Sequence, residues 1–159
     1  MAVIDTNIVA EIKWYNGQLV YLRDMFVTWI KEEGHEVDVL EEKITNKEGL
    51  SGTYETFKYI LTLDKAIKIS IVPYGIWIVA AKGRVDICGP VGSEKLVYLY
   101  KDGPVITIET KTRNYSEKST HKQFNNIEEE GWYWYDDSTI RKMVKLSREL
   151  LGYLLGRIQ

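Results

Sequence analysis

The stretch with the most suggestive chemistry runs from Val105 to Lys111 and reads Val-Ile-Thr-Ile-Glu-Thr-Lys. Its β-branched residues predict a strand. Because side chains alternate across a strand, Glu109 and Lys111 are expected to project side by side from one face. A carboxylate can bind Mg²⁺ or Mn²⁺, and a neighbouring amine can orient water or stabilise an anionic transition state. The pair has the chemistry of metal-dependent phosphodiester cleavage, although Glu and Lys also pair on solvated sheets.

The two histidines and the cysteine are also of catalytic type, but the residues around them in the sequence give a catalytic role less support. His35 follows a helix-ending glycine and is expected in an exposed loop, and His121 is expected on a polar helix face. The single cysteine, Cys88, precedes Gly-Pro in a short predicted strand, where a buried structural thiol is the favoured interpretation. The sequence has no glycine-rich phosphate loop followed by Lys-Ser or Lys-Thr, no Gly-x-Ser-x-Gly and no His-Glu-x-x-His.

Three short segments near the carboxylate–lysine pair form a recognisable series. They are Ile-Glu-Thr-Lys-Thr-Arg at 108–113, Lys-Gln-Phe at 122–124 and Glu-Gly-Trp at 130–132. Together they resemble the core of the PD-(D/E)XK nuclease superfamily, in its VRR-NUC-like and archaeal junction-resolvase branches. In that superfamily a strand with Glu-x-Lys leads to a helix that often carries a glutamine, and a further strand follows.

This resemblance, which covers residues 83–137, implies a role for five residues of the chain. Glu109 would be a metal ligand and Lys111 the catalytic lysine, while Gln123 would match the helix glutamine. Asp86 best matches the upstream metal-binding aspartate, and Arg113 extends the basic edge of the strand. The resemblance implies a Mg²⁺- or Mn²⁺-dependent nuclease, active or degenerate, that acts on DNA.

The hydrophobic pattern predicts an α+β fold with a central, mainly antiparallel sheet. After a break at Asn16-Gly17, apolar residues at helical spacing predict an amphipathic helix over 18–33. A polar helix is expected from Ser119 or Thr120 to Glu130, and a long C-terminal helix from Ile140 to Leu155. Strands with short turns imply a meander, and they are expected at 36–44, 57–63, 67–72, 76–81, 85–88, 96–100, 105–111 and 132–135.

This strand order bears directly on the metal site. The strand predicted at 96–100 lies between Asp86 and Glu109 in the sequence. In a simple meander the two carboxylates would therefore be two strand spacings apart, which is about 10 Å. At that distance they could not both bind one ion. A shared metal requires a different strand order.

Composition predicts one domain that spans residues 1–159, with 45% hydrophobic and 28% charged residues. Because the formal net charge is −2, any contact with DNA must come from a local basic patch. One cysteine excludes an intramolecular disulfide and a thiolate zinc site. With no bilayer-spanning apolar run and no signal-peptide pattern, a cytoplasmic protein is expected, and abundant Glu, Lys and Ile suggest a thermophile.

Two other functions compete with the nuclease. The element order also suits a helix-grip architecture, in which a curved sheet wraps the last helix and leaves a cavity for a small ligand or a protein segment. The residues expected to line that cavity, unless they serve in the core and in cross-strand pairs, are Tyr59, Tyr74, Trp77, Tyr98 and Tyr100. A helix and a paired strand over 112–135 would favour the nuclease, and a loose loop would favour the grip.

The third function is an adaptor that forms a homodimer through its C-terminal helix. This helix is more apolar than a terminal helix needs, although packing on the sheet explains the pattern more simply. The residues concerned are Leu150, Leu151, Leu154, Leu155 and Ile158.

Overall fold

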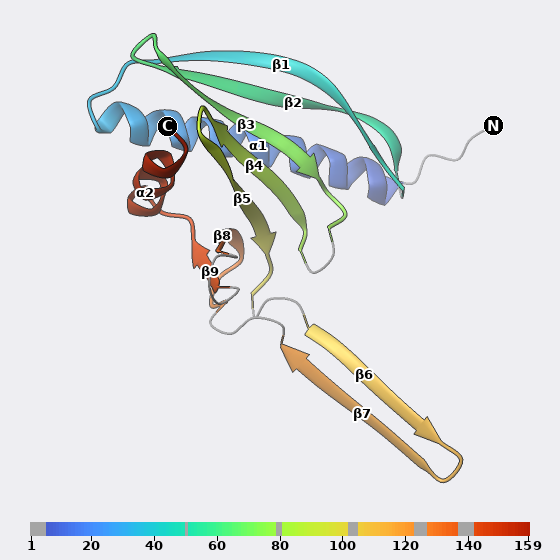
Figure 1. The fold of residues 1–159 in the computed structure, drawn as a ribbon. Coiled ribbons are helices and arrows are strands. Elements are labelled where there is room, and N and C mark those ends of the chain that lie inside the picture. The colour runs from blue at the N-terminus through green and yellow to red at the C-terminus, as the bar shows by residue number, and fades with distance from the viewer. Residues whose placement is uncertain (1–5, 50, 79–80, 102–104, 123–126, 137–141) are drawn as a thin grey trace, which may run out of the picture.

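The computed structural model describes residues 6–49, 51–78, 81–101, 105–122, 127–136 and 142–159, with the backbone alone at 6, 105–110, 115, 117–122 and 142. The fold is α+β, which confirms the predicted class (Figure 1). The chain order is α1 (Thr6–Glu32), β1 (Val37–Glu48), β2 (Gly52–Leu63), β3 (Ile67–Gly75), β4 (Gly83–Gly89), β5 (Gly92–Leu99), β6 (Val105–Thr112), β7 (Tyr115–Lys122), β8 (Gly131–Asp136), β9 (Lys142–Lys145) and α2 (Arg148–Ile158).

The main sheet has seven antiparallel strands in the order β1-β2-β3-β4-β5-β8-β9. The predicted meander is therefore confirmed from β1 to β5. β5 then pairs directly with β8, from Leu96 opposite Trp134 to Leu99 opposite Gly131. β6 and β7 form a separate two-stranded sheet, so they are an insertion between two neighbouring strands of the main sheet.

The strand predicted over 76–81 is wrong for the residues that the structure describes there. They form a bend with an isolated bridge between Ile78 and Ala81. The apolar run has another cause, because Ile76 is buried in the core and Trp77 packs against it. Residues 79 and 80 lie outside the described part of the chain.

Both helices lie on one face of the main sheet and share one hydrophobic core. α1 packs against β1, β2 and β3, and the sheet arches over it (Figure 1), while α2 packs against β4 and β5. The fully buried side chains of α1 recur at helical spacing and are Tyr15, Leu19, Leu22, Phe26 and Ile30. Within the described residues, neither helix combines the length and apolar character needed to cross a membrane.

The predicted break at Asn16-Gly17 is wrong, because α1 runs through both residues. Asn16 donates from Nδ2 to the Glu55 carbonyl at 3.1 Å and accepts from Thr56 Oγ1 at 2.7 Å. Thr56 is itself fully buried. These contacts with a distant strand stabilise the helix at a residue pair that locally favours a turn.

The C-terminal helix is shorter than predicted. Part of the expected helix forms β9, in which Met143 and Val144 pair with β8. The helix begins after Ser147, whose side chain accepts a hydrogen bond from Leu150 N at 3.1 Å and caps it. Its five apolar residues are buried in the chain's own core, which accounts for their pattern; dimerisation stays a prediction.

The helix predicted from Ser119 or Thr120 to Glu130 is also wrong where the structure describes it. β7 occupies residues 115–122 and pairs with β6. The two are joined by the two residues Arg113 and Asn114, a connection that favours a hairpin over a helix. Residues 127–130, in turn, have neither helical nor strand structure.

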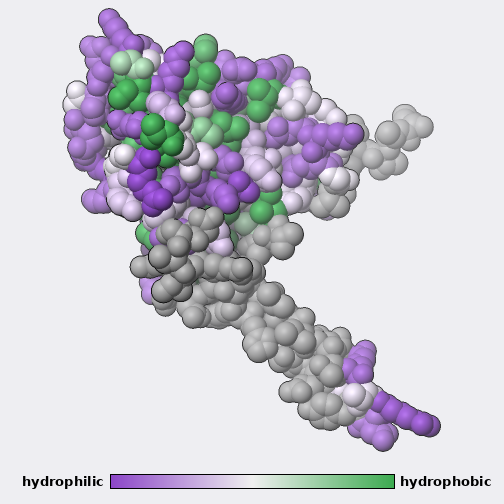
Figure 2. All heavy atoms as spheres, viewed as in Figure 1, coloured by the Kyte–Doolittle hydropathy of each residue, from purple (hydrophilic) through white to green (hydrophobic). Residues whose placement is uncertain are grey.

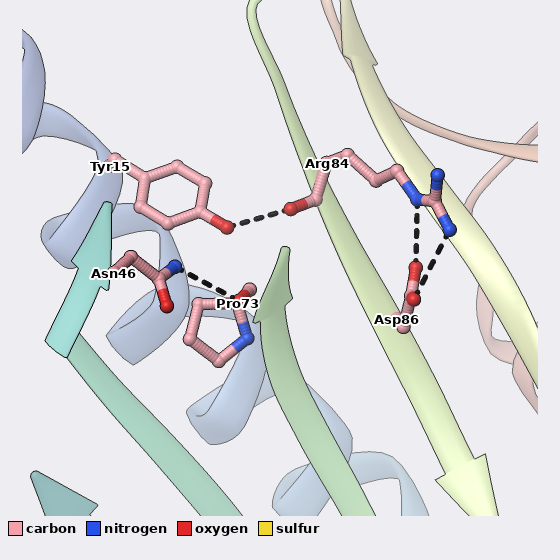
Figure 3. Close-up of polar contacts among 5 residues, drawn as sticks. All are labelled: Tyr15, Asn46, Pro73, Arg84 and Asp86. Atoms are coloured by element: carbon pink, nitrogen blue, oxygen red, sulfur yellow. Dashed lines mark hydrogen bonds and ion pairs between the residues drawn. The ribbon is translucent and has the colours of Figure 1, made fainter. Parts of the chain in front are cut away.

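Side-chain hydrogen bonds connect the strands of the main sheet where the backbone pairing between β2 and β3 ends. β2 pairs with β3 only up to Tyr59 opposite Ile71, whereas the β1–β2 hairpin continues to Glu48 opposite Gly52. Beyond that point Asn46 Nδ2 donates to the Pro73 carbonyl at 3.1 Å (Figure 3).

Glu48 makes the second of these side-chain connections. Its carboxylate accepts hydrogen bonds from Ile76 N and Trp77 N, each at 3.1 Å, and from the Tyr54 hydroxyl. Burial, followed by this bond to Glu48, raises the pKa of Tyr54. The far half of the β1–β2 hairpin is therefore fastened to the bend after β3.

We expect Glu48→Ala to lower the free energy of unfolding by about 2 kcal/mol, because two backbone N–H groups lose their acceptor. The measurement is urea unfolding, with Glu42→Ala as the matched control, since Glu42 is exposed on the same strand. Equal losses of unfolding free energy in the two variants would contradict the role of Glu48 in connecting the hairpin to the bend after β3.

Candidate functional site

The most distinctive surface feature is the β6–β7 hairpin, which we call the arm (residues 105–122). Its strands pair along their whole length, from Val105 opposite Lys122 to Thr112 opposite Tyr115. The arm projects away from the rest of the chain, which we call the body (Figure 1). An isolated two-stranded hairpin is marginally stable in water.

The arm and the body carry opposite net charges. The arm has four of the 21 basic residues and two of the 23 acidic residues, a net charge of +2 with His neutral. The body keeps 17 basic and 21 acidic residues, a net charge of −4. The basic residues of the arm are Lys111, Arg113, Lys118 and Lys122.

The described side chains at the tip of the arm are exposed and polar. Lys111, Arg113, Asn114 and Ser116 are all exposed. In Figure 2 the tip is coloured as hydrophilic, at the end of the projection. Two cations are therefore presented to solvent at the point furthest from the body.

Among the described residues, the structure places Asp86 on a different sheet from the other predicted nuclease residues. Glu109 and Lys111 lie on β6, where they pair with Lys118 and Ser116, whereas Asp86 lies on β4 of the main sheet. Arg113 is in the turn of the arm, and Gln123 lies outside the described residues. Asp86 and Glu109 thus belong to different sheets.

Asp86 has a partner of its own. Arg84 Nε lies 2.9 Å from Asp86 Oδ1, and Arg84 donates a second bond to Oδ2 at 3.2 Å (Figure 3). The side chains are only 21% and 22% exposed, and the guanidinium carbon stands 3.7 Å from the centre of the Tyr74 ring. On β4, Val85 and Ile87 face the core, so Asp86 is on the sheet face opposite the helices.

The other candidate metal ligands and nucleophiles that the structure describes are also separated from one another. Among the residues that the structure describes, no three His, Cys, Asp or Glu side chains are grouped to hold a metal ion. His35 Nδ1 forms a hydrogen bond with Asp64 Oδ2 at 2.6 Å, and this contact lowers the pKa of Asp64. Cys88 is half-buried, and burial raises the pKa of its thiol, which disfavours the thiolate.

In the described part of the chain, the aromatic residues proposed for a helix-grip cavity are divided among different surroundings. Tyr59 is buried in the core, and Tyr74 and Tyr100 are 55% and 53% exposed. Trp77 and Tyr100 line a cavity of about 440 Å³, while Tyr98 lines another of about 260 Å³. The long helix under the curved sheet is α1, at the other end of the chain from the helix expected there.

The arm was not predicted from the sequence, because a possible helix cap and a following glycine favoured a helix over residues 119–130. Residues 115–122 give only a weak strand signal, because no apolar face alternates with a polar face there. Asn114, a residue common in tight turns, separates this segment from the strand already predicted. A turn residue shortly after a predicted strand is therefore the signal that favours a hairpin here.

Comparison with protein-family models, with curated proteins and with solved structures gives no match. The function must therefore be inferred from the geometry and charge of the chain itself.

We expect Asp86→Ala to act on stability through Arg84. Loss of a charge-assisted pair that is about one-fifth exposed should reduce the free energy of unfolding by about 1 kcal/mol. A double-mutant cycle with Arg84→Ala, measured by thermal unfolding, tests the coupling between them. If Mn²⁺ raised the Tm of the wild type and not of Asp86→Ala, Asp86 would be a metal ligand instead.

Proposed function

We propose that this chain is a nucleic-acid-binding protein and that the arm is its contact element. The observation that carries the proposal is a net-positive β-ribbon, with exposed Lys111 and Arg113 at its tip, that projects from a net-negative body. A two-stranded antiparallel ribbon is one of the two elements that fit the major groove of B-DNA. Cations at its tip can neutralise phosphates or meet base edges.

The charge difference between the arm and the body also favours one orientation for a bound nucleic acid. The field of the body opposes a polyanion, whereas the field of the arm attracts one. A nucleic acid would therefore approach with the arm first, and the partner's phosphates would be kept from most of the body surface. This agrees with the expectation that a chain of net charge −2 needs a local basic patch.

The metal-dependent nuclease and the helix-grip binding domain stay predictions. The nuclease needs Asp86 and Glu109 on one ion, and these residues lie in different sheets. The grip needs one aromatic cavity, and its five residues are divided among the core, the surface and two cavities. Binding through the arm requires neither arrangement.

The double change Lys111→Ala with Arg113→Ala should weaken DNA binding about tenfold or more at low salt. It should also reduce the slope of log affinity against log salt by about two, because each of the two cations would neutralise one phosphate. Fluorescence anisotropy with a labelled duplex measures both quantities. The matched control is Lys13→Ala with Lys31→Ala, which removes two exposed lysines from α1.

Two results would overturn this proposal. One is a wild-type protein that binds no nucleic acid at low salt. The other is an equal loss of affinity in the arm variant and the α1 variant, because binding would then depend on total charge and not on the arm.

Replacing residues 105–122 with a short Gly-Ser linker should abolish DNA binding and shift the Tm of the body by only a few degrees. The reason is that β5 and β8 pair without help from the arm. Thermal unfolding followed by circular dichroism measures the stability, and anisotropy measures the binding. A body that unfolds on this replacement would show that the arm has a structural role.

A further inference from the structure

A pocket lies at the root of the arm, between α1 and the start of β8. Its volume is about 260 Å³. One wall comes from α1, at Gln18, Tyr21 and Met25, which are spaced along one helix face. The opposite wall comes from Tyr98 near the end of β5 and from Trp132 near the start of β8.

Three of the nine residues that line the pocket are aromatic, namely Tyr21, Tyr98 and Trp132. The Trp132 and Tyr98 rings meet edge to face at 5.4 Å, and Tyr98 meets Trp14 in the same way at 4.8 Å. Trp132 is 4% exposed and therefore fixed in the core, whereas Tyr21 is 55% exposed at the mouth. The pocket combines a rigid aromatic floor with an accessible aromatic ring.

Polar groups stand around these rings. Gln18 Oε1 accepts a hydrogen bond from Trp132 Nε1 at 3.0 Å, which orients the Gln18 amide and leaves its NH₂ group as a donor. Glu130 and Lys145 line the exposed rim, where the Lys145 ammonium group also forms an ion pair with Glu129. Burial, followed by the nearby Glu130 carboxylate, raises the pKa of Tyr98, which places that carboxylate beside the aromatic wall.

We propose that this pocket binds an unpaired nucleobase. The exposed ring of Tyr21 can stack on a planar heteroaromatic ring, and this stacking accepts any base because every base has a π-face. An amide donor, a carboxylate and an ammonium group can hydrogen-bond to the edge of a base.

The position of the pocket links it to the arm. Tyr98 lies seven residues before the first residue of β6, and Glu130 lies just before β8, on the segment that returns from β7. A nucleic acid that extends along the arm from its tip to the body could place one base in this pocket. The inference rests on the proposed function where the base belongs to a bound nucleic acid. A free nucleotide is the other source of such a base.

The experiment compares two labelled duplexes of the same sequence, one fully paired and one with a single unpaired adenine. We expect the wild type to bind the second duplex about tenfold more tightly, because stacking of one base on an aromatic side chain is worth that much. Tyr21→Ala should lose this preference and Tyr21→Phe should keep it. The matched control is Tyr153→Ala, since Tyr153 is also on a helix and is 56% exposed.

The proposal is overturned if the wild type shows no preference for the unpaired base, or if Tyr153→Ala loses the preference as fully as Tyr21→Ala. If the wild type binds neither duplex, the proposed function fails, and the pocket is then tested alone. Adenosine monophosphate is titrated while tryptophan fluorescence is followed. Saturable quenching in the wild type that Tyr21→Ala lacks would support the pocket, and no saturation at millimolar nucleotide would overturn it.

Discussion

The pairing of β5 with β8 is the contact on which the second half of the chain depends. It joins residues about 30 positions apart, Leu99 and Gly131, across the whole of the arm. Once this ladder forms, β9 can pair with β8, and the short segment after β9 can deliver α2 to the core face. The same ladder excludes β6 from the main sheet, because the edge of β5 that β6 would otherwise use is already occupied.

Local patterns were sufficient to predict many elements of this fold. The alternating run from Val105 to Lys111 is β6, and the aromatic run from Trp132 to Tyr135 lies within β8. Both predictions rest on a period of two that is visible in a few residues. The amphipathic part of α1 was equally clear, because its apolar stripe has the spacing of one helix face.

Long-range contacts decided what the sequence could not predict. Asn16 stays helical because its side chain bonds to residues about 40 positions later, and no local rule contains that information. Asp86 and Glu109 would be two strand spacings apart even with β6 beside β5, and the pairing of β5 with β8 places them in different sheets. The Arg84–Asp86 pair is different, since residues two apart on a strand share a face and this partnership was readable from sequence.

Cations and aromatic rings meet repeatedly on the surface of the body. Lys82 Nζ stands 4.1 Å from the centre of the Trp14 ring, with Tyr98 and Tyr100 also close, near the strand end that leads to the arm. Arg157 lies over Trp134 and Tyr153 while it pairs with Glu94. Such contacts keep charged heads hydrated while their stems cover apolar surface, and they help to fix the rings that frame the root of the arm.

The arm is, in topological terms, a long loop between two strands that already pair. The entropy lost on closing a loop grows only with the logarithm of its length, so a longer or shorter insertion at this point changes the cost of closure little. The body can therefore keep its sheet and core while the inserted ribbon varies in length, charge and tip. The junction between β5 and β8 is thus a natural position for grafting other recognition segments onto this scaffold.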